Sequence, residues 1–226
     1  RKCKDVNALI LHASQVEQRC IDDASAVLDR IQISQTMDAS LEDEACRTLQ
    51  QIIDSQMNTP QGPRTILDYM RNYDWSPRVN TFCMQKFQQI ASGTEGQIEN
   101  IFVDDIHRQI LRFCLRFDEN KDVCKSTCIF LACVAVDTSH REQLVDAGAC
   151  QIIFKSFVCG KTDEELVLNG LKSLELLLSV KQCYEQFKRQ LGLVTEAIST
   201  HGSNVPIQYL GTKIVSSLDS PPPSDN

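Results

Sequence analysis

Apolar side chains recur every three or four residues along most of the chain, which is the pattern of amphipathic helices. The clearest stretch is 141–178, where a short apolar-faced segment runs into a glycine at Gly148. An apolar segment follows over 152–157, and after a polar loop a longer one covers 164–178. The pattern predicts three helices with short connections, and we expect this stretch to be one unit of a repeat.

Five segments along the chain carry a similar apolar stripe, and each is predicted to be the third helix of such a unit. Their spacings are 38, 44, 44 and 38 residues, counted between the positions where the stripes begin. A period near forty residues is typical of armadillo or HEAT repeats. The last segment fits poorly, as expected for a terminal repeat whose outer face meets water. The third helices are predicted to start near Leu41, Val79, Val123, Val167 and Val205.

The remaining segments complete one helical domain over 1–218. Residues 1–40 have a helical apolar pattern and are predicted to form a cap at the first end of the stack. Residues 219–226 include three consecutive prolines and no apolar stripe, so a disordered tail is expected there. Shorter helices are predicted between the third helices, at 63–70, 98–115 (one or two helices) and 190–200.

Composition narrows the class of protein. The chain has 226 residues, 42% of them hydrophobic, with nine Gly and seven Pro, which suits a sizeable helical core. A net charge of -7 argues against a nucleic-acid-binding surface and favours protein partners. No run of about eighteen apolar residues is present, so no transmembrane segment is expected. The sequence opens on Arg1, and we expect any acylated N-terminus to precede it.

The residues that could carry chemistry form no recognisable site. The eleven cysteines include no CxxC pair, and Cys124 and Cys128 lack a histidine at zinc spacing, so reduced thiols without metal are expected. Gly160-Lys161-Thr162 imitates the end of a phosphate-binding loop, but Lys155 stands where such a loop needs glycine. Solvated or capping roles are expected for the four histidines, His12, His107, His140 and His201. We therefore expect no cofactor and no enzyme activity, and a Cys/His-dependent enzyme is a less favoured alternative.

The only tryptophan leaves two interpretations open. Trp75 lies in the polar connection Tyr73-Asp74-Trp75-Ser76-Pro77 between two predicted helices. A tryptophan there commonly plugs the gap between helices. It could instead be an exposed anchor for a partner, since tryptophan is enriched at binding hot spots.

The sequence Arg141-Glu-Gln-Leu-Val-Asp-Ala-Gly-Ala149 resembles the first helix and joint of an armadillo repeat. The chain as a whole resembles the armadillo repeats-only family of apicomplexan parasites in size, repeat count, cysteine richness and absence of a second domain. The resemblance implies an all-α fold: a right-handed armadillo-repeat superhelix of about five repeats with an N-terminal helical cap.

The same resemblance implies a function. Members of that family are cytosolic adaptors held on the rhoptry, a secretory organelle, by an acylated N-terminus. They position the organelle, and their partners include a motor myosin, an adenylate cyclase and a dedicated binding protein. The acylated Met-Gly-Cys region of the family is not in this sequence, so no lipidated residue is assigned. A regulatory fragment of a larger armadillo protein is the alternative.

A partner groove is predicted on the third helices, at the sixth and tenth positions after each start. Armadillo proteins of the nuclear-import kind carry Trp and Asn ladders at these positions, and this chain does not, which disfavours import-cargo binding. The candidate groove residues are Arg47, Gln51, Gln85, Gln89, Ile129, Cys133, Ser173 and Leu177.

Overall fold

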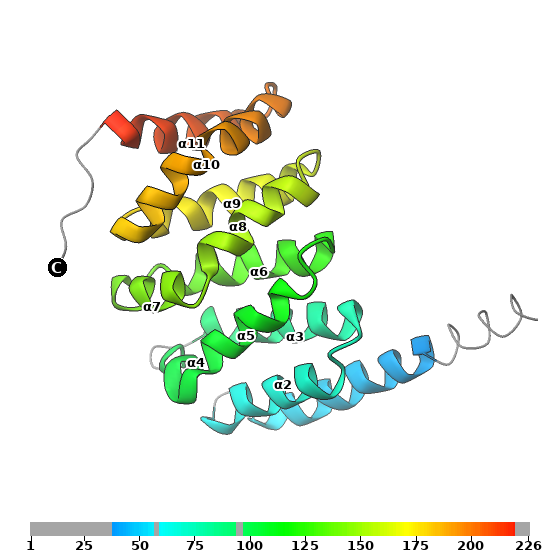
Figure 1. Ribbon diagram of the computed structural model, residues 1–226. Helices are drawn as coiled ribbons and strands as arrows, with labels where there is room; N and C mark the ends of the chain where they lie inside the picture. Colours follow the sequence, from blue (N-terminus) through cyan, green and yellow to red (C-terminus); the bar gives the residue numbers. More distant parts are fainter. Residues whose placement is uncertain (1–37, 57–58, 94–96, 220–226) are drawn as a thin grey trace, which may run out of the picture. The chain divides into compact units, whose positions relative to one another are not determined.

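The computed structural model describes residues 38–56, 59–93 and 97–219 (Figure 1). Within these ranges every regular element is a helix and there is no strand, so the predicted all-α class is confirmed. The chain divides into two compact units, Arg1–Ala45 and Cys46–Asn226; the helix over 38–56 includes residues of both, and every later element belongs to the second. The predicted cap over 1–40 and the predicted tail over 219–226 lie almost wholly outside the described residues.

The second unit is built from short helices that alternate between two rows. Residues 38–56 are helical. The elements that follow are α2 (Gln61–Asn72), α3 (Pro77–Ala91), α4 (Glu99–Phe102), η1 (Val103–Asp105), α5 (Ile106–Leu115), α6 (Lys121–Val134), η2 (Thr138–His140), α7 (Arg141–Asp146), α8 (Ala149–Cys159), α9 (Glu164–Leu177), α10 (Lys181–Thr200), α11 (Val205–Ser216) and η3 (Ser217–Asp219).

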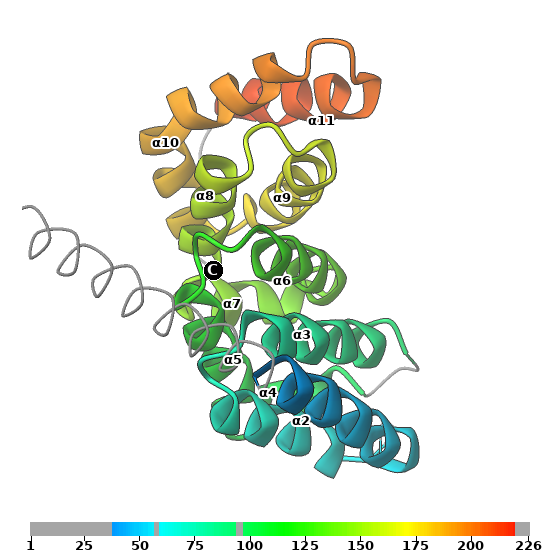
Figure 2. The same cartoon turned by 90° about the vertical axis from the view of Figure 1, so that its right-hand side faces the viewer.

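One row consists of α3, α6, α9 and α11, each packed on the next (Figure 2). The other row consists of α2, α5, α8 and α10, which are also in contact in that order. Each helix of the second row packs on the following helix of the first row, so the repeating unit is a helix pair. This two-row arrangement is compatible with an α-solenoid.

The four helices of the first row correspond to predicted third helices of the sequence analysis, and we keep that name for them. They begin at equivalent capping residues. Ser76, Asn120, Asp163 and Asn204 each accept a hydrogen bond from the backbone N–H three residues later, at 3.0–3.1 Å. Such side chains satisfy amides that the first helical turn leaves unpaired. The caps are 44, 43 and 41 residues apart. They therefore mark the repeat more evenly than the apolar stripe does.

Measured from these caps, two of the predicted starts are out of register. Val79 and Val123 each lie three residues after their cap, but Val167 lies four residues after Asp163 and Val205 only one after Asn204. The error at Val167 arose because Leu166 beside it is also apolar and fully buried. A broad apolar stripe fixes the register of a helix only to within about one residue.

In the last two repeats the paired helices approach closely over a glycine of the third helix. The seventh residue after the cap is Cys83 in α3, Thr127 in α6, Gly170 in α9 and Gly211 in α11. A Cβ on Gly170 would lie 2.8 Å from Cε1 of Phe157 in α8. A Cβ on Gly211 would lie 2.6–2.9 Å from three side-chain carbons of Ile198 in α10.

The helices of the best-formed unit follow the sequence prediction. Gly148 has φ 98°, a left-handed conformation that favours glycine, and it separates α7 from α8 as expected of the joint. The segment 98–115 indeed holds more than one helix, since α4 and α5 are separated by η1, where Asp104 and Asp105 also have positive φ.

The prediction of a short helix over 190–200 was wrong, because α10 runs from Lys181 to Thr200. Its first half buries Cys183, Tyr184 and Phe187 against the core. Charged and polar residues between these three obscure the apolar periodicity in the sequence.

Candidate functional site on the third helices

The predicted groove residues fall into three groups by exposure. Arg47, Gln51, Gln85 and Gln89 are exposed, and Ile129 and Cys133 are half-buried. Ser173 and Leu177 are buried in the packed interior, so these two residues are not available to a partner. The predicted positions are therefore accessible in α3 and α6, where the groove stays a prediction, and they are buried in α9.

The correction in α9 has a local physical reason. The Ser173 hydroxyl lies within hydrogen-bond distance of two carbonyl oxygens, that of Cys128 at 2.6 Å and that of Asn169 at 3.0 Å. Ser173 thus ties α9 to α6 instead of facing solvent. Counting from Asp163 moves the predicted positions back by one residue, to Lys172, which is exposed, and Leu176, which is half-buried.

With this register the four helices present one consistent surface. The ninth and thirteenth residues after each cap are exposed or half-buried in every case. We call this set the third-helix face. It consists of Gln85 and Gln89 in α3, Ile129 and Cys133 in α6, Lys172 and Leu176 in α9, and Lys213 with Ser217 at the end of α11.

Ion pairs between neighbouring third helices neutralise part of the charge beside this face. The Lys125 ammonium lies 3.1 Å from Glu165 and 3.6 Å from Asp163, and the hydrogen bond that it donates to Glu165 raises the pKa of Lys125. Glu175 pairs with Lys213 and raises the pKa of that lysine in the same way. Lys172 has no ion pair with any described residue and is exposed, so its charge remains available. The face is a mixed surface of amides, aliphatic side chains and an available cation.

A cavity of about 590 Å³ opens at the α3 end of the face. Its floor includes Phe82, whose ring lies 4.8 Å from the Lys86 ammonium, and its wall includes Gln85. The other lining residues are Cys46, Pro77, Arg78, Thr81, Asn120 and Asp122. The cavity therefore offers an aromatic surface surrounded by polar groups next to a predicted groove residue, which is suited to a partner side chain.

Trp75 lies in the connection before α3 and is 47% exposed. Its ring is tilted against that of Tyr73, with the centroids 6.3 Å apart. Tyr73 in turn stacks on Tyr69 at 6.0 Å. The tryptophan is thus supported on one side by an aromatic pair and open on the other, which fits an anchor better than a buried plug.

The predicted solvated role was wrong for the three histidines that the structure describes, because His107, His140 and His201 are all buried. His140 and His201 do occupy capping positions, at the start of α7 and the end of α10. Burial lowers the pKa of His107 from its usual value of 6.5. Arg108 and His140 lower this pKa further, whereas Asp105 and the backbone of Ile101 oppose the shift. His12 lies outside the described residues.

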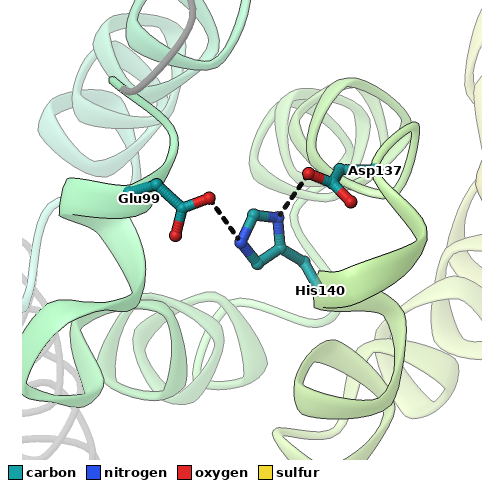
Figure 3. Close-up of side chains that lie close together, drawn as sticks. All are labelled: Glu99, Asp137 and His140. Carbon is teal, nitrogen blue, oxygen red and sulfur yellow. Dashed lines mark ion pairs between the residues drawn. The ribbon is translucent and has the colours of Figure 1, made fainter.

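His140 lies between two carboxylates (Figure 3). Its Nε2 is 3.3 Å from Glu99 and its Nδ1 is 3.9 Å from Asp137, while the ring stacks on Phe102 with centroids 3.9 Å apart. The possible ligand atoms lie within 4.8 Å of one another. However, the two carboxylates approach different ring nitrogens. A metal ion bound by Nε2 and Glu99 would therefore lack Asp137 as a ligand, since Asp137 lies beside Nδ1. Zinc sites use three or four protein ligands, so the geometry fits a histidine held by two carboxylates better than a metal centre.

The thiols of the described part of the chain are free cysteines, and most are buried. Burial raises the pKa of Cys114 and of Cys128 to about 12, and it also raises the pKa of Cys83 and Cys124. The thiolate is the nucleophilic form of cysteine, so these side chains are poorly suited to covalent catalysis.

Sequence reasoning missed two features of the structure, the exposure of Lys172 and Leu176 on α9 and the placing of buried His140 between two carboxylates. The capping residue Asp163 was the signal that could have placed Lys172 and Leu176. Glu99 and Asp137, by contrast, are 38 residues apart in the sequence and share no motif.

Comparisons with protein-family models, with curated proteins and with solved structures found no match to this chain. In the described part of the chain no helix has both the length and the apolarity needed to cross a bilayer.

Proposed function

We propose that this protein is a non-enzymatic scaffold of the armadillo kind, which binds protein partners along the third-helix face. The observation that carries the proposal is the repetition of that face. In four successive helices the ninth and thirteenth residues after the cap reach the surface, while the other flank of each helix is buried. A repeated surface of this kind is what solenoid proteins use to bind extended partners.

The side chains of the face indicate the kind of partner. Gln85 and Gln89 can hydrogen-bond a peptide backbone or amide, and Ile129 and Leu176 provide apolar contact. Lys172 adds a cation without an ion-pair partner among the described residues. The expected partner segment therefore combines apolar side chains with a carboxylate opposite Lys172. It differs from the basic peptides that Trp and Asn ladders grip.

A narrower form of the proposal rests on the family resemblance alone. In it the protein is an adaptor on the cytosolic face of a rhoptry, where it recruits a motor myosin, an adenylate cyclase and a dedicated binding protein. The support is the likeness in size, repeat count and cysteine content. Fluorescence localisation of the full-length protein tests it: a signal on the organelle surface supports the adaptor role, and a diffuse signal contradicts it.

The scaffold proposal is tested by charge reversal on the face. The double variant Gln85→Glu with Lys172→Glu replaces an amide and a cation by carboxylates at two exposed positions. Quantitative affinity capture of partners should fall by roughly tenfold or more, because each lost charge or hydrogen-bond contact contributes on the order of 1 kcal/mol. Glu142→Lys on α7 is the matched control and should retain the partners. If a double variant with a normal unfolding midpoint captured its partners as well as the unmodified protein does, the third-helix face would not be the binding surface.

A further inference from the structure

A second hollow lies on the other row of helices, between α8 and α10. Its volume is about 450 Å³. Four side chains of α8 line one side and four side chains of α10 line the other. In each helix the four residues are spaced by three or four positions, so they lie on one face of that helix. The lining residues are Gln151, Phe154, Lys155 and Val158 in α8, and Gln186, Arg189, Gln190 and Leu193 in α10.

The centre of this α8–α10 groove is apolar and open. Val158 is 60% exposed, which is high for a large aliphatic side chain on a helix that otherwise packs well. Phe154 lies beside it and is nearly buried, and Leu193 faces it from α10 as a half-buried side chain. The three form an apolar floor that solvent reaches through the hollow.

Most polar groups of the rim have no partner among the residues that the structure describes. Gln151, Gln186 and Gln190, together with Arg189, make no side-chain hydrogen bond or ion pair with any residue in the described ranges. Lys155 is the exception, because its ammonium lies 3.0 Å from Asp118. Amide and guanidinium donors around an apolar floor match the composition of binding sites, where a few polar groups fix orientation.

The charge of the rim is opposite to that of the whole protein. The two charged residues that line the groove, Lys155 and Arg189, are both basic, although the chain as a whole has a net charge of -7. Arg189 lines both this groove and a second hollow of about 490 Å³ that continues along α10 past Gln186 to Lys181. The hollow is therefore extended, and within the α8–α10 groove Arg189 is the lining cation that makes no ion pair with a described residue.

We propose that the α8–α10 groove binds an amphipathic helix of a protein partner that carries carboxylates beside its apolar stripe. The stripe on α10 from Gln182 to Leu193 spans about 18 Å at 1.5 Å per residue, which is the length of a helix of about three turns. Helices bind grooves of this kind through apolar side chains spaced at i, i+3 or i+4, and i+7. An anionic membrane fits less well, because membrane-binding faces are rich in Lys and Arg, and of the two cations that line this groove Lys155 is paired with Asp118.

A defined peptide pair tests the inference. The probe is a fluorescein-labelled, hydrocarbon-stapled helical peptide with leucines at i, i+3 and i+7 and glutamates on both flanks of the stripe. Its twin has lysine in place of every glutamate. Fluorescence anisotropy should show that the acidic peptide binds about tenfold or more tightly than the basic one. Arg189→Glu should reverse this preference, and Val158→Asp should weaken the acidic peptide by about tenfold.

Matched controls keep the outcome decisive. Arg112→Glu, an exposed position on α5 that lines neither this groove nor the third-helix face, makes the same charge change as Arg189→Glu and should leave the binding of the acidic peptide unchanged. Circular dichroism should show the native helix content in all variants. Three results would overturn the proposal: equal binding of the two peptides, no saturable binding of the acidic peptide, or Arg189-dependent binding to phosphatidylserine vesicles with none to the peptide.

Discussion

Two glycines in the third helices should resist replacement by alanine, while a third glycine nearby should accept it. A Cβ built on Gly211 would lie 2.6, 2.7 and 2.9 Å from three carbons of Ile198, a β-branched and buried side chain. On Gly170 the same atom would meet the fully buried ring of Phe157 at 2.8 and 3.1 Å. A Cβ on Gly192, in the middle of α10, would have no atom within 4 Å apart from its chain neighbours and the backbone of its own helix.

The magnitude follows from two opposing terms. In a helix interior alanine is about 1 kcal/mol more favourable than glycine, and this term stabilises all three variants. Overpacking of a tight core costs about 1–3 kcal/mol, and this term applies only where the new Cβ overlaps its neighbours. Gly192→Ala should therefore stabilise the protein by roughly 0.5–1 kcal/mol. Gly211→Ala and Gly170→Ala should be about 1–3 kcal/mol less stable than Gly192→Ala.

Equilibrium unfolding in urea, with one common slope for the three variants, measures these differences. Because the propensity term is shared, the comparison with Gly192→Ala isolates the overlap term. If Gly211→Ala matched Gly192→Ala in its unfolding midpoint, the close approach of α10 to α11 over a missing side chain would be refuted. The same result would refute the idea that glycine is needed at the seventh position after the cap to let the paired helices approach.

Three further predictions concern the caps, a histidine and the thiols. Asn120 accepts hydrogen bonds from the N–H groups of Asp122 and Val123. Asn120→Ala should therefore lower the free energy of unfolding by about 1 kcal/mol, and Asn120→Ser should lower it by much less. Equal stability of the two variants would contradict the capping role. Burial lowers the pKa of His107. Below about pH 6.5 the unfolded state therefore binds more protons than the folded state, and the free energy of unfolding falls as the pH falls. His107→Leu should therefore show a smaller fall in unfolding midpoint between pH 7 and pH 5, roughly spanning that pKa, and an unchanged fall would exclude His107 as a source. In the native protein iodoacetamide should label half-buried Cys133 well before fully buried Cys128, with equal rates in denaturant, as followed by mass spectrometry.

The sequence was most informative about helix boundaries, which single residues such as glycines and capping side chains mark locally. Gly148 marks a backbone position that needs positive φ, and Asp163 is a side chain that caps a helix, so the boundaries of α7, α8 and α9 could be predicted closely. These signals depend on a few neighbouring residues and are independent of how the helices pack.

Features set by packing between repeats were not predictable in the same way. Leu166 and Val167 are both apolar and both buried, so the stripe alone did not show which of them begins the repeat. That single-residue shift exchanged exposed Lys172 for buried Ser173 in the candidate groove. The burial of His140 between Glu99 and Asp137 arises where separate helices meet, and no spacing in the sequence anticipates it.

The most direct test of the scaffold claim is site-specific photo-crosslinking of the protein in its native cell extract. Benzoylphenylalanine would be placed singly at Gln85, Ile129 and Lys172, which occupy the same position in three successive third helices, and at Glu142 on α7 as the control. The scaffold account predicts that the same partner protein is crosslinked from at least two of the three neighbouring positions and is absent from the control. Crosslinking of that partner equally well from Glu142, or from none of the three positions, would contradict the account.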